Sequence, residues 1–307
     1  MTRYAIQRLL LLVPTLFFVA LITFALARAA PGSPFDRNQD RPLPQATIER
    51  LNRIYGLDKP MHEQFVLFLG NAVRFDFGSS LVRDRAVADI VKQQFPVSAQ
   101  LGVQALLLAL AIALPLGVIS ALRHNSAVDY GSLLFATIGT TIPSFVLAIF
   151  AIYIFSVNLH WLPVFGWGTV DKMVLPTIIL SLGPMAFLTR ITRASMLEAI
   201  RQDYVRTARA KGLSEQAVIV GHAMKNAMIP VATVLGPFTA FLITGSFLIE
   251  TVFSVPGLGR EFVRSIGSRD YPVIMGVFLL FAFLIAAANL TVDLVYGVLD
   301  PRIKVGK

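Results

Sequence analysis

The side chains that most often perform chemistry are few in this sequence and poorly spaced for it. No cysteine is present, which excludes disulfides, thiolate nucleophiles and cysteine-ligated metals. The nucleotide-binding loop G-x-x-x-x-G-K-[ST], whose backbone amides cradle phosphates, is also absent. The histidines are scattered over separate segments without the spacing of metal ligands: His62, His124, His160 and His222. We therefore expect no catalytic residue, no metal and no cofactor bound by this chain.

Two carboxylates in apolar segments could instead couple transport to an ion, because a charge inside a membrane span is costly enough to imply function. Glu250 and Asp293 both lie near the ends of apolar runs, where partial hydration lowers that cost. We interpret both as interfacial or helix-packing residues, and Asn289 as an interhelical hydrogen-bonding residue. A self-contained ion-coupled transporter is one candidate class of function that these residues leave open. A membrane scaffold or receptor is another.

The composition predicts an all-α integral membrane protein. Hydrophobic residues make up 55% of the 307 residues and charged residues 15%, against roughly 45–50% apolar residues in an ordinary soluble domain. The net charge of +9 could suit a nucleic-acid partner. In so apolar a chain, however, the excess lysine and arginine is better placed at the cytoplasmic membrane surface. We therefore expect contact with membrane lipid and no nucleic-acid partner.

Six apolar segments are long enough to cross a bilayer, and we expect them to form one transmembrane domain over residues 1–307. They cover residues 9–27, 97–122, 131–157, 173–190, 230–251 and 273–299. The first could also be a cleaved signal peptide, but its apolar run is too long for a usual signal core. The fourth contains Pro176 and Pro184, which predicts a segment buried in the bundle, where neighbouring helices satisfy the freed carbonyls.

Lysines and arginines near the span ends predict that both termini are cytoplasmic. The residues on that side are Arg3, Arg8, Arg123, Arg190, Arg193, Arg201, Arg206, Arg209, Lys211, Lys225, Arg302, Lys304 and Lys307. Residues 28–96 then form a long extracytoplasmic region. Its stretch "HEQFVLFLGNAVRF" predicts an amphipathic helix that lies on the membrane surface or packs against the spans.

The polar segment 195–229 lies between two of these spans and has helical periodicity. Its apolar side carries Leu197, Ile200, Tyr204, Val205 and Ala208, and basic residues occupy the other side. Gly212 is suited to end this helix in the left-handed conformation, and Ser214 to cap a second helix that runs to about Met228, before Pro230 opens the next span. We expect a helix–turn–helix hairpin. Periodicity alone leaves open whether it fits a groove on another protein or binds anionic lipid headgroups.

The hairpin resembles the coupling loop of type I ABC importer permeases. Aligned on Gly212, only Ala208 and that glycine match the general Glu-Ala-Ala…Gly pattern. The departures, in "DYVRTARAKGL" and the following His-Ala…Asn-Ala…Ile-Pro run, are similar to the peptide-transport branch of the family. Further matches extend from end to end: "APGSPF", "DFGSS", "FPVSAQLG", "RITRASMLEAI", "IETVFSVPGLG", "RDYPV" and "DPRIK". The resemblance is to the first permease subunit of oligopeptide importers.

This resemblance implies a six-span permease of the bacterial inner membrane. It would pair with a homologous second permease, two ATPase subunits that hold ATP and Mg, and an extracytoplasmic substrate-binding protein. The cargo implied is oligopeptides, with dipeptides, glutathione, nickel chelates and antimicrobial peptides as alternatives. The resemblance places ATPase coupling on Tyr204, Val205, Arg206, Thr207, Ala208, Arg209, Ala210, Lys211, Gly212 and Leu213. The loop around Phe253, Pro256, Gly257, Leu258 and Gly259, with residues 28–96, is the candidate contact with the binding protein.

Overall fold

The structure is a computed structural model that describes the backbone of residues 2–29, 49–50, 53, 56 and 58–299. Side chains are described over the same ranges except residues 2–9 and 292–299, so the side chain of Asp293 lies outside the description. Within the described residues there is no β-strand, only one isolated bridge between Ser79 and Ala86. The all-α prediction is confirmed.

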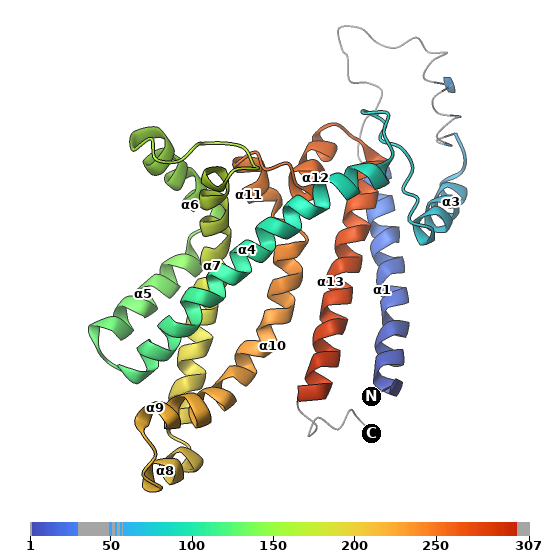
Figure 1. Ribbon diagram of the computed structural model, residues 1–307. Helices are drawn as coiled ribbons and strands as arrows, with labels where there is room; N and C mark the ends of the chain where they lie inside the picture. Colours follow the sequence, from blue (N-terminus) through green and yellow to red (C-terminus); the bar gives the residue numbers. More distant parts are fainter. Residues whose placement is uncertain (1, 30–48, 51–52, 54–55, 57, 300–307) are drawn as a thin grey trace.

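The helices form a bundle with short helices at both ends (Figure 1). They are α1 (Thr2–Ala29), α3 (Met61–Val73), α4 (Val87–Leu122), α5 (Ala127–Thr141), α6 (Ser144–Ala151), the π-helix η1 (Ile152–Asn158), α7 (Val170–Ile200), α8 (Asp203–Ala210), α9 (Glu215–Ala217), the π-helix η2 (Val218–Ala223), α10 (Met224–Ile243), α11 (Phe247–Val252), α12 (Leu258–Gly267) and α13 (Tyr271–Leu299).

By length and composition, five helical segments of the described chain could cross a membrane: α1, α4, α7, the run from α9 to α11, and α13. The remaining predicted span, residues 131–157, is not one continuous helix. Its α5 and α6–η1 parts meet at an angle of 103°. The break follows from Pro143, because the residue before a proline is driven out of the helical region, and Ile142 is extended at ψ 125°.

Other predicted boundaries also shift. Helix α4 begins at Val87 rather than at residue 97, so the end of the predicted extracytoplasmic region is helical. Helix α10 begins at Met224 and contains Pro230, which therefore does not open this helix as expected. At the other end, Gly245 adopts a φ of +101° and separates α10 from α11, so Glu250 belongs to a different short helix.

Helix α7 lies at the centre of the bundle. In its apolar segment 56% of the residues are buried, against 22–33% in the other membrane-length helices. Pro176 and Pro184 are both buried within it. The prediction that the proline-containing span is enclosed by its neighbours is confirmed.

Glycines permit the closest contacts of this bundle. A Cβ at Gly117 of α4 would lie 2.6 Å from the Cβ of Thr192 in α7, and one at Gly139 of α5 would lie 2.8 Å from the Cβ of Ala186. A Cβ at Gly102 would overlap the backbone carbonyl of Leu242 in α10. Helices α4, α5, α7 and α10 therefore touch backbone to backbone, as membrane helices do where small residues meet.

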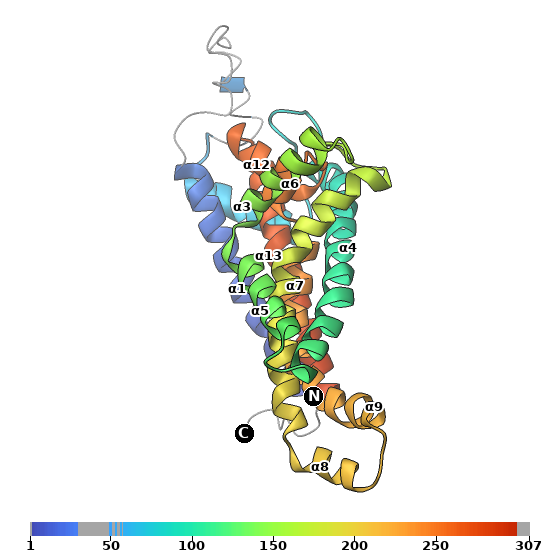
Figure 2. The same ribbon diagram turned by 90° about the vertical axis from the view of Figure 1, so that its left-hand side faces the viewer.

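The bundle has two distinct ends. Helices α8 and α9 project from the end where α1 begins and α13 finishes, which we call the hairpin end (Figures 1 and 2). Helices α3, α11 and α12 lie toward the opposite end (Figure 1). Helix α3 packs on α1 through Phe65 and Phe68, whose ring centroids lie 5.3 and 6.1 Å from that of Phe24. The predicted amphipathic helix is therefore one that packs against the spans.

Gly117→Leu should destabilise the bundle, because overpacking a close helix contact typically costs about 1–3 kcal/mol. We expect a lower midpoint of thermal unfolding in detergent. Gly131→Leu is the matched control, since a Cβ at this α5 position meets no atom within 4 Å. Equal midpoints for the two variants would contradict the close α4–α7 contact.

Candidate functional site

The hairpin begins later than the sequence predicts. Helix α7 continues to Ile200, the chain turns at Arg201 and Gln202, and α8 begins at Asp203. The predicted single amphipathic helix from Leu197 is therefore wrong, because Leu197 and Ile200 belong to α7. The hairpin proper is α8, the turn at residues 211–214, and the arm formed by α9 and η2.

Helix α8 is docked on the bundle by two apolar side chains. Val205 is fully buried and Ala208 is 4% exposed. They pack in one cluster with Met196 of α7 and with Val218 and Ala223 of η2. Tyr204, predicted on the same apolar side, is instead 37% exposed. The hairpin is thus held against the helices that enter and leave it.

The turn between the two arms adopts the conformation that its glycine and serine predict. Gly212 has a φ of +76° and its N–H donates to the carbonyl of Arg209 at 2.9 Å. A Cβ at Gly212 would meet no atom within 4 Å, so the backbone conformation, and not crowding, requires glycine. The Ser214 hydroxyl accepts from the N–H of Ala217 at 3.4 Å, which caps the second arm as predicted.

An ion pair closes the turn from outside. The Arg209 guanidinium donates to both carboxylate oxygens of Glu215, at 2.6 and 3.1 Å. These bonds raise the pKa of the Arg209 guanidinium above its usual value. Both side chains are exposed, so we regard the pair as an orienting contact of small energy.

The remaining surface of the hairpin is exposed, small and basic. We call it the hairpin tip, and its residues are Tyr204, Arg206, Thr207, Arg209, Ala210, Lys211, Gly212 and Leu213. Across the described residues, no three histidine or acidic side chains are placed to hold a metal ion. The tip therefore presents an exposed, positively charged surface.

The second arm continues directly into the bundle. Helix α9, η2 and α10 follow one another without a break from Glu215 to Ile243, so the predicted end near Met228 is wrong. The first arm is joined to α7 by only two residues. A displacement of the hairpin tip would consequently act on α7 and α10 together, without a flexible linker between.

Sequence reasoning missed a buried ion pair above the hairpin. Asp129, in the first turn of α5, is 1% exposed and accepts from Arg193 of α7 at 2.5 and 2.9 Å. The Ser120 hydroxyl of α4 donates to the same carboxylate at 2.6 Å, and the N–H of Asn125 at 2.9 Å. One carboxylate thus fastens α4, α5 and α7. The only sequence signal, an acid in a first helical turn, indicates no partner.

Asp129→Ala should destabilise the protein strongly, because removing one member of a buried pair typically costs about 3–5 kcal/mol. Thermal unfolding in detergent measures this. The matched control is Asp203→Ala, whose carboxylate is 96% exposed and lies 3.5 Å from Arg206. We expect little change in the stability of Asp203→Ala. A similar loss of stability in both variants would contradict the conclusion that the Asp129 carboxylate fastens α4, α5 and α7.

A second buried carboxylate organises the opposite end. Glu250 is fully buried, and its Oε2 accepts from the N–H of Arg260 at 3.1 Å. The Ser98 hydroxyl of α4 accepts from the N–H of Leu258 at 2.8 Å. Both bonds satisfy free amides at the start of α12. A Cβ at Gly257 would overlap this carboxylate, so glycine is needed for the close approach.

Most of the loop residues singled out from the sequence are buried. Phe253 is 1% exposed and Leu258 is fully buried, so neither offers its side chain to a binding protein in this structure. Phe253 instead packs in a cluster with residues of α4, α6 and α7, and Leu258 in a separate cluster with residues of α4 and α13. Gly257 and Gly259 are buried as well, and among the loop residues singled out from the sequence only Pro256 is exposed.

The motifs "DFGSS" and "RDYPV" meet in space. The Ser80 hydroxyl donates to Asp270 at 2.5 Å, and the N–H of Leu81 donates to the same carboxylate at 3.1 Å. Nearby, Arg83 forms an ion pair with Glu261 of α12 at 2.6 Å. The segment before α4 is therefore fastened to α12 and to the start of α13, and these loops form one surface.

These features define a polytopic helical membrane protein with a docked hairpin at one end. The family of binding-protein-dependent transport system inner membrane components matches residues 113–305, and the N-terminal component of such systems matches residues 1–102. The chain belongs to this family of ABC transporter permeases, and is an integral inner-membrane protein. The predictions of fold and family are confirmed.

Relatives match along the whole chain. The dipeptide transport system permease protein DppB of Bacillus subtilis is 45% identical, over 100% of this chain and 99% of the relative. The oligopeptide transport system permease protein OppB of Salmonella typhimurium is 41% identical, over 99% and 100%. A crystal structure of an amino acid ABC transporter with histidines gives a TM-score of 0.52 at 14% identity, over 67% of this chain and 92% of that one. That likeness concerns the fold.

Proposed function

We propose that this chain is the membrane permease subunit of a peptide importer, without an enzymatic site of its own and driven by separate ATPase subunits. The observation that carries this proposal is the identity of 39–45% along the full chain to permeases named for dipeptide or oligopeptide transport. Because relatives of both names match at similar identity, the proposal covers peptides as a class and sets aside the preference for oligopeptides.

The hairpin tip is the proposed contact with an ATPase subunit that binds ATP and Mg. Its small residues allow a close approach, and its arginines and lysine complement an acidic groove. The docking of Val205 and Ala208 supports this role, because force applied to the tip reaches α7 and α10 through packed side chains. Closure of the ATPases would then move the bundle as a rigid body between two states of access.

In this proposal the hairpin end is cytoplasmic, and with it both chain termini. The exposed Arg201, Arg206 and Lys211 at this end agree with the positive-inside rule. The opposite end would face the extracytoplasmic binding protein through Pro256 and the surface built by the segment before α4. A homologous second permease would complete the path for the peptide.

Reconstitution in liposomes tests the function. With the second permease, the ATPases and the binding protein present, we expect peptide uptake that requires ATP. Uptake by this chain alone, driven by an ion gradient, would contradict the proposal and favour the ion-coupled alternative.

Gly212→Leu should uncouple ATP hydrolysis from transport while the protein still inserts and assembles. A side chain fits the space at Gly212, but a left-handed conformation costs a non-glycine residue about 1–2 kcal/mol, so the turn is expected to change shape. ATP hydrolysis and peptide uptake are measured on the same proteoliposomes. Gly131→Leu is the control, since that glycine is exposed on a regular helix. Normal substrate-stimulated uptake by Gly212→Leu would refute the assigned role.

A further inference from the structure

Two cavities adjoin where α1, α3 and α13 meet near the end opposite to the hairpin. One has a volume of about 340 Å³ and walls of charged, polar and apolar residues, and the other about 360 Å³ and almost purely apolar walls. Both are lined by side chains of the same three helices, and Phe77 lines both. The two cavities therefore adjoin at Phe77, and we call them the polar part and the apolar part.

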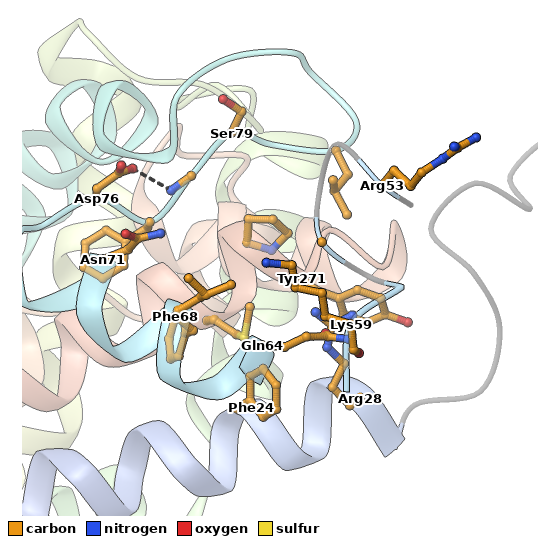
Figure 3. A pocket seen from close by; sticks show the side chains of 17 residues that line it. Phe24, Arg28, Arg53, Lys59, Gln64, Phe68, Asn71, Asp76, Ser79 and Tyr271 are labelled. Atoms are coloured by element: carbon orange, nitrogen blue, oxygen red, sulfur yellow. Dashed lines mark hydrogen bonds between the residues drawn. The ribbon is translucent and has the colours of Figure 1, made fainter. Parts of the chain in front are cut away.

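The polar part carries positive charge. Among the described residues, its walls include Arg28, Lys59 and Arg53 but only one acid, Asp76. The Oδ1 of Asp76 already accepts from the N–H of Gly78 at 2.9 Å. Figure 3 shows Arg28 and Lys59 beside Tyr271 on one side of the cavity, whereas Arg53 points away from it. The cavity therefore favours an anionic ligand.

Arg28 is prepared to bind such an anion. Its guanidinium carbon lies 5.4 Å from the centre of the Phe24 ring and 5.9 Å from that of Tyr271, so aromatic rings hold the group in place. Its Nε is buried and has no hydrogen-bond partner among the described residues. A guanidinium held in this way keeps donors for phosphate oxygens, which arginine binds in a two-pronged geometry.

The apolar part extends the site along the spans. Val13, Phe17 and Ala20 of α1, Val73 of α3, and Leu280 and Phe283 of α13 line it. From Phe24 to Val13 the helix rises by about 16 Å, which is close to the depth of one leaflet, roughly 15 Å. An extended acyl chain fits this length, whereas a peptide would bring backbone polar groups against apolar walls.

We propose that this site binds an anionic phospholipid, with the phosphate at Arg28 and Lys59 and an acyl chain in the apolar groove. The lipid would join α3 to α1 and α13, because all three helices line both parts of the site. Basic pockets between membrane helices commonly recognise anionic headgroups in this way. The assignment concerns the leaflet at the end opposite to the hairpin and is independent of the cargo.

Native mass spectrometry of the complete chain, purified with the subunits that accompany it, tests the proposal. The probes are phosphatidylglycerol and phosphatidylcholine with the same acyl chains. We expect phosphatidylglycerol to bind about tenfold more tightly, the scale of one charge-assisted contact. Equal binding of the two lipids to the unaltered chain would overturn the proposal whatever the variants do.

Variants separate the two parts of the site. Arg28→Gln with Lys59→Gln should remove the preference for phosphatidylglycerol, while Arg28→Lys should retain most of it. The exposed Arg74→Gln, a charge change on the same region but outside both cavities, should leave it unchanged. Ala72→Trp, which fills the groove, should weaken both lipids. Loss of the preference in Arg74→Gln would indicate a general surface effect and contradict the site.

Glycerol phosphate distinguishes the lipid from a free phosphate. We expect no displacement of phosphatidylglycerol by this soluble headgroup at concentrations that saturate the site with lipid. Displacement would show that the acyl groove contributes nothing, and would overturn the assignment to a phospholipid. Thermal unfolding of each variant confirms that the compared chains are folded.

Discussion

The close approach of α4 to α7 is the contact on which the rest of the structure depends. It requires glycine at position 117, where α4 lies against Thr192, and the small residues Ala109 and Ala113 that are fully buried along the same helix. Without a hydrophobic driving force between helices in lipid, such packing supplies much of the association energy. The Asp129–Arg193 pair then fastens α5 to the same unit, so α4, α5 and α7 form one packed unit with α7 at its centre.

The hairpin is held in place by the same packed helices. Its two arms continue into α7 and α10, and its inner face is buried through Val205 and Ala208. The sequence contains no nucleotide-binding loop, so ATP could drive transport only through another subunit. A docked tip suits this task better than a loose loop, because interfaces that are packed move as units and transmit small displacements. At the opposite end, the buried carboxylates of Glu250 and Asp270 likewise fasten segments that are separate in the sequence.

Residue types alone predicted the features that depend on neighbouring residues in the sequence. Gly212 adopts the left-handed conformation, Ser214 caps the second arm, and the proline-containing α7 is enclosed by other helices, each as the residue types indicate. The breaks at Ile142 and at Arg201 were not predicted, because apolar periodicity continues across them. The buried state of Phe253 and Leu258 and the partner of Asp129 depend on segments distant in sequence. A single sequence carries no direct signal for such contacts, whereas full-length family motifs identified the class of protein.

We propose that the hairpin tip transmits motion from an ATPase subunit. Because the chain contains no cysteine, single cysteines can be introduced and cross-linked in the purified assembly. Ala210→Cys in the tip should cross-link to an ATPase subunit, and ATP should change the yield. Tyr130→Cys, 62% exposed at the same end of the bundle, should not cross-link. Equal yields from the two positions, or no ATPase adduct at Ala210→Cys in an active assembly, would contradict this account.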